Sequence, residues 1–167
     1  MRKAVTWGLF LAWLANDTEE WFTMAPWSQQ NATATGKRHP GPAWLREPVT
    51  SAQSRVAISL MGVLVLAAAA RGAATGGRSS FFQSTLVGFG AHGFGHLALS
   101  AAHRGYTPGV ATAPTVVIPF SLWAWRELGR QGVPRNDVRM WLSAAVLLPA
   151  SLAAVHSTAR ALTRPTS

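Results

Sequence analysis

The chain has 167 residues, of which 49% are hydrophobic and 13% are charged, and it contains no cysteine. This length fits one domain, and the charged fraction is low beside the roughly 25% of ordinary soluble domains. The lack of cysteine excludes disulfides and thiolate chemistry. The formal net charge is +9, but the basic residues flank apolar blocks instead of forming one stripe, which argues against a nucleic-acid partner.

The apolar residues form five blocks that are separated by basic, proline-containing connections. Each block approaches the ~20 residues that cross the hydrocarbon core of a bilayer. The pattern predicts an all-α fold, a multi-span transmembrane helix bundle of about five helices, with residues 1–167 in a single membrane-embedded domain. We expect a multi-pass protein of the cell membrane that has the lipid bilayer as its surrounding partner. The predicted spans are about 4–22, 54–71, 80–103, 108–127 and 137–162.

The connections between these spans are rich in turn-forming residues. The longest covers residues 23–53 and is expected to be polar and exposed. A tight turn is predicted before the fourth span, which Pro108 can start because proline presets φ and needs no N–H partner. The basic residues divide almost evenly between the two sides of the predicted bundle, so the positive-inside rule gives no orientation.

The first block ends in a polar cluster that contains Asn16, Asp17, Glu19 and Glu20. Carboxylates in an apolar segment are costly unless something pairs with them, so this cluster is a candidate functional site. Asn16, Glu19 and Glu20 are spaced i, i+3, i+4, which places their side chains on one side of a helix. Asp17 is offset by about 60° from Glu20 on that helix, so it can support or replace Glu19.

The third block carries a glycine-rich segment with two histidines, Gly88-Phe-Gly-Ala-His-Gly-Phe-Gly-His96. Gly88, Ala91 and Gly95 lie at i, i+3, i+7 and predict a small-residue face that another helix approaches closely. His92 and His96 lie at i, i+4 and share a face, which is a common spacing for a metal-binding pair.

Glu19, Glu20, His92 and His96 form a candidate ligand set for a divalent metal. Mixed nitrogen and oxygen donors suit zinc, iron or manganese, and the sequence does not select among them. The same residues can work without a metal, because a carboxylate in apolar surroundings can act as a general acid or base with histidine as its partner. A third alternative is that the carboxylates and imidazoles only satisfy each other inside the bundle.

Three features follow one another along residues 7–125. A first apolar helix ends in Asn16-Asp-Thr-Glu-Glu20, a later helix carries histidine, and Tyr106-Thr-Pro-Gly109 opens the next helix. In these features the chain resembles the HXXEE family of small bacterial integral membrane proteins. That family is named for His-x-x-Glu-Glu in its first helix, and it also has a second histidine and a Tyr-x-Pro-Gly motif.

The resemblance implies that His96 is the second histidine, with His92 as the alternative, and that Asn16 stands where the family has histidine. An amide can accept or donate a hydrogen bond, but it cannot titrate and is a poor metal ligand. Either this member has lost the activity of the family, or it uses His92 as a substitute ligand.

We expect an enzyme in the membrane that acts on a lipophilic small molecule by hydrolysis, isomerisation or cyclisation. The candidate catalytic residues are Glu19, Glu20 and His96, and the candidate substrate-binding residues are Asn16, Asp17 and Tyr106. Tyr106 either points its hydroxyl toward the cluster or anchors a turn at the membrane interface. The alternative function is non-catalytic: ligand binding, a transport accessory or a degenerate family member.

Overall fold

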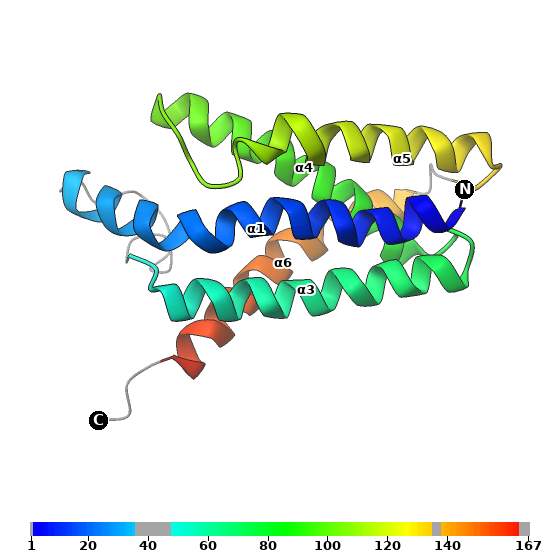
Figure 1. The fold of residues 1–167 in the computed structure, drawn as a ribbon. Helices are drawn as coiled ribbons and strands as arrows, with labels where there is room; N and C mark the ends of the chain where they lie inside the picture. Colours follow the sequence, from blue (N-terminus) through cyan, green and yellow to red (C-terminus); the bar gives the residue numbers. More distant parts are fainter. Residues whose placement is uncertain (1, 36–47, 135–137, 164–167) are drawn as a thin grey trace.

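The computed structural model describes residues 2–35, 48–134 and 138–163, and within them the chain is entirely helical (Figure 1). It has five α-helices and one short π-helical segment, and the described residues contain no strand. The all-helical expectation is therefore confirmed. The helices are α1 (Arg2–Thr35), α3 (Ser51–Ala74), α4 (Ser80–His103), α5 (Ile118–Arg130) and α6 (Val138–Leu162), and the π-helical segment is η1 (Ala113–Val117).

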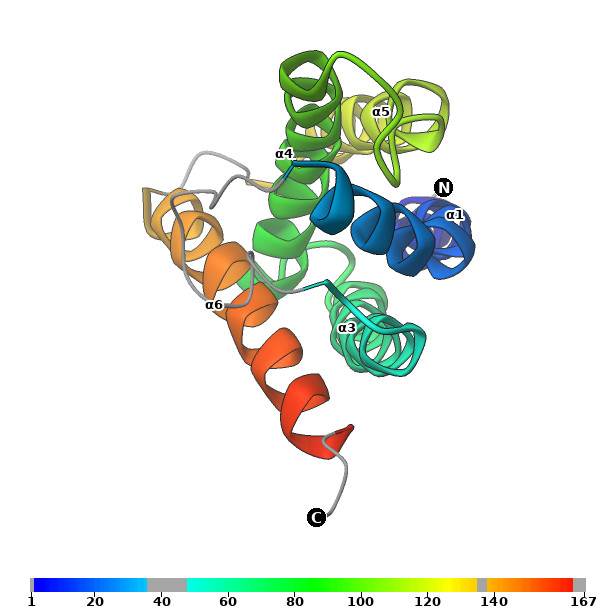
Figure 2. The same ribbon diagram turned by 90° about the vertical axis from the view of Figure 1, so that its left-hand side faces the viewer.

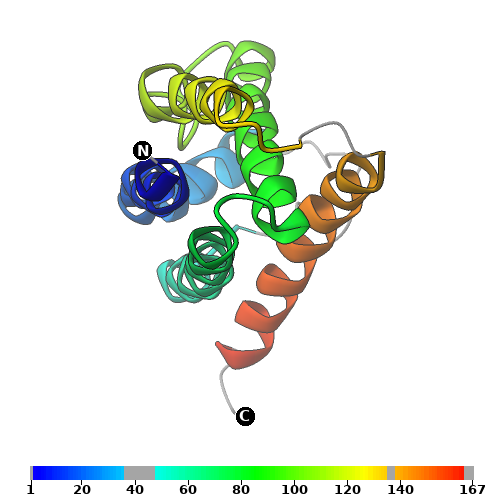
Figure 3. The ribbon, with the colours of Figure 1, turned by 90° about the vertical axis from the view of Figure 1, so that its right-hand side faces the viewer.

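The helices pack around α1 and α4. Helix α1 lies along α3 on one side and along η1 and α5 on the other, while α6 crosses both α3 and α4 obliquely (Figures 2 and 3). The main core lies between α1, α3, α4 and α5, where fully buried apolar side chains meet, and a smaller cluster joins α3 to α6. The largest buried side chains of the main core are Phe82, Leu9, Leu86, Leu128 and Val5.

Two predicted elements have different bounds in the structure. Residues 23–35, expected in a loop, continue α1 as helix. Of the rest of that expected loop, residues 36–47 lie outside the described part of the chain, and residues 51–53 already belong to α3. The fourth predicted span does not begin at Pro108. Gly109 has a φ of +82°, which is incompatible with a right-handed helix, so the helical segment starts at Ala113 and is divided into η1 and α5.

Among the described residues, two helices are long and apolar enough to cross a membrane: α3, and α6 over Met140–Leu162. The other three predicted spans do not reach this standard. The apolar stretch of α1 is interrupted by its acidic cluster, and α5 has 13 residues, fewer than the ~20 that a span needs. The structure therefore shows a helical bundle with two candidate spans.

The predicted small-residue face of α4 holds at Gly88, which is buried and where an added Cβ would lie 3.6 Å from Leu148 Cβ of α6, and it is wrong at the other two positions. Ala91 and Gly95 are exposed, and an added Cβ at Gly95 would meet nothing within 4 Å. The close approach is made by Gly93, where an added Cβ would lie 2.8 Å from Val117 Cγ1 and 3.0 Å from Ile118 Cγ1. Glycine at position 93 therefore lets η1 pack directly on α4.

Alanine substitutions at these two glycines should have opposite effects. We expect Gly93→Ala to lower the free energy of unfolding by about 1–3 kcal/mol, because the new methyl group overpacks the contact with Val117. Gly95→Ala should raise it by up to about 1 kcal/mol, because alanine favours the helical state and position 95 has room. Unfolding of both variants beside the wild-type chain measures the difference; equal effects would contradict the packing of η1 on α4.

Candidate functional site

A carboxylate from α1 meets two imidazoles from α4 inside the bundle. Oε1 of Glu20 lies 3.0 Å from Nε2 of His96 and 3.6 Å from Nε2 of His92. The two Nε2 atoms lie 2.9 Å apart. The i, i+4 spacing on α4 brings both rings to the same point, as the sequence predicts.

These three residues differ in their access to solvent. The side chains of Glu20 and His96 are each 7% exposed, whereas that of His92 is 31% exposed. Among the described residues, Glu20, His92 and His96 each offer one ligand atom, and these three atoms lie within 4.8 Å of one another. They could therefore hold one metal ion together. The cluster thus has a closed side at His96 and a more open side at His92.

Asn16 links this cluster to the segment that precedes η1. Its Nδ2 donates a hydrogen bond of 3.0 Å to Oε1 of Glu20, and its Oδ1 accepts one of 3.0 Å from the Thr112 hydroxyl. The side chain is fully buried, so both polar ends of the amide are satisfied where water is excluded. Asn16 therefore holds the Glu20 carboxylate in place by a hydrogen bond.

Glu19 points away from the histidines, to the segment between α4 and η1. Its carboxylate accepts hydrogen bonds from the Tyr106 hydroxyl at 2.7 Å and from the Thr112 hydroxyl at 2.7 Å. It also accepts from the backbone N–H groups of Ala111 at 3.3 Å and Thr112 at 2.9 Å. The Thr112 hydroxyl has one proton, which Glu19 shares with Asn16. The Tyr106 hydroxyl and the two backbone N–H groups donate to Glu19 alone, and together these donors form a strong charge-assisted set that fastens this segment to α1.

The Tyr106–Gly109 turn is also fixed by contacts outside the carboxylate. The indole N–H of Trp27 donates to the backbone carbonyl of Tyr106 at 2.9 Å. An added Cβ at Gly109 would lie 2.6 Å from Nε2 of His96, so this position needs glycine for space as well as for its positive φ. Partial burial, and then the nearby Glu19 charge, raises the pKa of Tyr106, so its hydroxyl stays protonated and donates.

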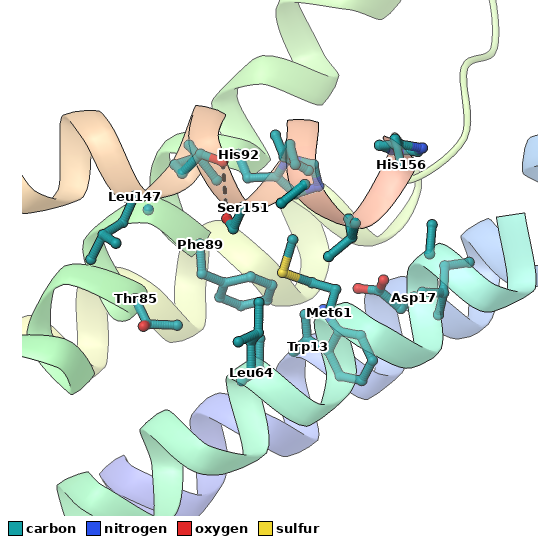
Figure 4. A pocket seen from close by; sticks show the side chains of 18 of the residues that line it. Trp13, Asp17, Met61, Leu64, Thr85, Phe89, His92, Leu147, Ser151 and His156 are labelled. Carbon is teal, nitrogen blue, oxygen red and sulfur yellow. Dashed lines mark hydrogen bonds between the residues drawn. The ribbon is translucent and has the colours of Figure 1, made fainter. Parts of the chain in front are cut away.

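A cavity of about 390 Å³ opens between α1, α3, α4 and α6, next to the cluster. Asp17, Glu20, His92 and His156 contribute polar groups to its wall, and most of the other lining side chains are apolar. Figure 4 shows Asp17 and His156 toward one side of the cavity and Leu147 toward the other. The labelled side chains between them include Met61, Phe89, His92 and Ser151.

The structure thus separates the predicted site residues into two groups. Glu20, His92, His96 and Asn16 come together at the cluster, and Asp17 lines the cavity beside it. Glu19 and Tyr106 bind each other at the turn, away from the imidazoles. Sequence reasoning missed Thr112, which carries no distinctive motif, and the contact of Gly109 with His96.

Removal of the Tyr106 hydroxyl tests the role of the turn. We expect Tyr106→Phe to lower the free energy of unfolding by about 1–1.5 kcal/mol, just below the roughly 1.5–3 kcal/mol of hydrogen bonds to charged groups, because the tyrosine is 47% exposed. Thr18→Val is the control, since the Thr18 hydroxyl is exposed and bonds only the backbone of its own helix at Leu14. An equal loss in both variants, measured by thermal unfolding, would contradict the anchoring role.

Comparison with known proteins places the chain in a family. The family described as "Protein of unknown function with HXXEE motif" matches residues 7–124. No curated protein and no solved structure matches the chain. The two glutamates of the motif correspond to Glu19 and Glu20, and the motif histidine corresponds to position 16. The chain therefore belongs to the HXXEE family, and it carries asparagine where the motif has histidine.

Proposed function

We propose that Glu20, His92 and His96 bind a divalent metal ion inside a multi-span membrane bundle, and that the protein is an enzyme that uses this ion on a lipophilic substrate. The observation that carries the proposal is the convergence of three ligand atoms beside a largely apolar cavity. Zinc, iron and manganese all accept two imidazoles and a carboxylate.

The separations between the ligand atoms fit a common metal geometry. Ligands on tetrahedral zinc, at about 2.0–2.1 Å from the ion, lie about 3.3 Å from one another. The three separations here, 2.9, 3.0 and 3.6 Å, lie on both sides of that value. Small adjustments of the side chains are therefore enough to place one ion among the three atoms.

Hydrogen bonding alone serves these three atoms poorly. Nε2 of His96 is within hydrogen-bond distance of both Glu20 Oε1 and His92 Nε2. A neutral imidazole nitrogen carries either one proton or one lone pair, so it cannot point a full hydrogen bond at both partners. A cation at the centre accepts a lone pair from each of the three atoms at once. This favours a metal site over a pair that only satisfies itself.

Three protein ligands leave a coordination position for water or substrate, which is the pattern of catalytic zinc. His92, the more exposed ligand, lines the cavity together with Glu20, so that position can face the cavity. A divalent ion there would polarise a substrate carbonyl or activate water. Among hydrolysis, isomerisation and cyclisation, hydrolysis uses this arrangement most directly. In this scheme Asn16 positions Glu20, and Glu19 positions the turn that covers His96.

The surface supports a membrane location for the bundle. Large apolar side chains are exposed on all five α-helices, and such widespread apolar exposure is unusual for a soluble monomer. Lipid tails cover such side chains at no cost. The two candidate spans, α3 and α6, carry several of them. Examples that are at least half exposed are Leu11, Phe22, Val63, Phe94, Leu142 and Val146.

A non-catalytic role is the second candidate function, and one observation favours it. Asn16 stands where the motif has histidine, and its amide already donates to Glu20. A chain that lost its motif histidine could keep the cavity as a ligand-binding site without the chemistry. Binding of zinc by the purified protein separates the two candidates, because a degenerate cluster would not hold the ion.

Adjacent glutamates on α1 provide a matched pair of variants for the metal site. We expect zinc at one ion per chain in the wild-type protein and in Glu19→Gln, because Glu19 is engaged by the turn. Glu20→Gln should weaken zinc binding by at least about 100-fold, since loss of an outer-shell partner alone costs about 10–100-fold. Elemental mass spectrometry and zinc titration of the detergent-purified proteins measure both.

Glu19→Gln serves as the folding control for Glu20→Gln, because both variants make the same chemical change one residue apart on α1. His96→Ala should lose zinc in the same way as Glu20→Gln. Zinc that remains in Glu20→Gln and His96→Ala, or is absent from the wild-type protein, would contradict the metal site.

Relocation of a ligand tests whether His92 substitutes for the motif histidine. We expect His92→Ala to weaken zinc binding by at least about 100-fold and the double variant Asn16→His/His92→Ala to recover most of it. The physical reason is that the end of the position 16 side chain already lies 3.0 Å from Glu20 Oε1. No recovery in a double variant that unfolds normally would show that position 16 cannot reach the ion.

A further inference from the structure

The cavity beside the metal cluster has ionisable side chains toward one end and is mostly apolar toward the other, where Thr85 also lies (Figure 4). On α3 its lining runs from Ser54 to Val65, and on α4 it runs from Phe81 to His92. These helices are joined by a short turn and run antiparallel (Figure 1), so Ser54 and His92 are at the same end. The lining of α3 from Ser54 to Leu64 spans ten residues, or about 15 Å at the rise of an α-helix.

The apolar end has the shape of a site for a hydrocarbon chain. Its volume of about 390 Å³ lies toward the lower end of the roughly 300–1,000 Å³ of small-molecule sites, which fits one chain better than several. The apolar lining side chains beyond the polar end are Met61, Leu64, Phe81, Phe89, Leu147 and Leu148.

Two buried polar groups at the other end lack full hydrogen bonding. Oγ of Ser54 has no hydrogen-bond partner, although the residue is only 1% exposed. Asp17 is 7% exposed, and its carboxylate receives a long hydrogen bond of 3.5 Å from Asn16. A buried polar group without a partner costs roughly 1–3 kcal/mol, and both residues line the cavity. A ligand that enters the cavity can therefore supply the missing partners.

The charges at this end favour a neutral polar group on the ligand. Asp17 and Glu20 place two carboxyl groups in the cavity wall. An anionic head would enter a largely apolar cavity beside these groups, which is costly without a cation to pair with it. A hydroxyl has one donor and two acceptor lone pairs, which suits an acceptor carboxylate and a serine hydroxyl together.

We infer that the cavity binds a neutral lipid with a single hydrocarbon chain and a hydroxyl head, with the head at Asp17 and Ser54 and the chain along Leu64, Phe89 and Leu147. This inference rests on the proposed function, because it identifies the lipophilic substrate class that is presented to the metal cluster. Asp17 and Ser54 are then the residues that recognise the head.

Quenching of tryptophan fluorescence tests this inference, because Trp13 lines the cavity. The probe is ω-bromododecanol, added to the zinc-loaded protein in phosphatidylcholine nanodiscs. The signal is the quenching seen in the wild-type chain minus that seen in Trp13→Phe, which isolates Trp13 from the other tryptophans. We expect saturable quenching of Trp13 by ω-bromododecanol. The affinity should be at least about tenfold lower for bromododecane and for ω-bromododecanoate.

Variants separate recognition of the head from insertion of the chain. Asp17→Leu and Ser54→Ala should each weaken the signal, Asp17→Leu by about tenfold because a buried hydrogen bond to the ligand is lost. Thr18→Leu is the control, since Thr18 is an exposed neighbour on α1 that does not line this cavity. Ala154→Phe should abolish the signal, because Ala154 is an exposed lining position where a larger side chain fills the cavity at little cost to folding.

The outcomes distinguish this inference from the metal site. Equal quenching of Trp13 by bromododecane and bromododecanol would overturn the inference, since the chain alone would account for binding. The absence of a Trp13 signal in protein that holds zinc would also overturn it and leave the metal site intact. An alcohol-specific signal in protein that binds no zinc would support the inference and reject the metal-dependent function.

Discussion

Two adjacent glutamates on α1 bind two different parts of the molecule, and the arrangement of the bundle depends on this division. Successive residues of an α-helix are about 100° apart, so Glu19 faces the turn before η1 while Glu20 faces the histidines of α4. Apolar helix surfaces can slide past one another at little cost, whereas a buried polar network has one satisfied arrangement. The two carboxylates therefore set the position of α1 along both neighbours.

The Tyr106–Gly109 turn contacts both halves of this arrangement, Glu19 through Tyr106 and the histidine partner of Glu20 through Gly109. Tyr106 provides a donor to Glu19, and Gly109 provides a positive φ and the space that the His96 ring occupies. Thr112, just beyond the turn, bonds both Glu19 and Asn16. A turn that is remote in sequence from the first helix thus closes over the cluster of Glu20, His92 and His96.

Local patterns in the sequence were enough to predict much of the fold and the pairing of α1 with α4. Helix α4 has the predicted bounds because Ser79 caps its start and Arg104 ends it in a left-handed conformation. The i, i+4 histidines face one carboxylate because helical spacing dictates that face. The family, too, was identified from three short motifs.

Other features depend on tertiary packing that a single sequence does not contain. The spacing of Gly88, Ala91 and Gly95 was as good a small-residue pattern as the one at Gly93, and only the position of η1 decides between them. Glu19 and Glu20 both satisfied the i+3, i+4 rule, and the location of the turn assigns them to different partners. A second hollow on the outer face, between α1 and α3, shares three wall residues, Trp13, Asp17 and Ile58, with the inner cavity. Rotation of these three side chains, which are buried or half-buried, would therefore join the inner cavity to the surroundings of the bundle. A lipophilic molecule could then pass between the outer hollow and the inner cavity without separation of the helices and without passing through water.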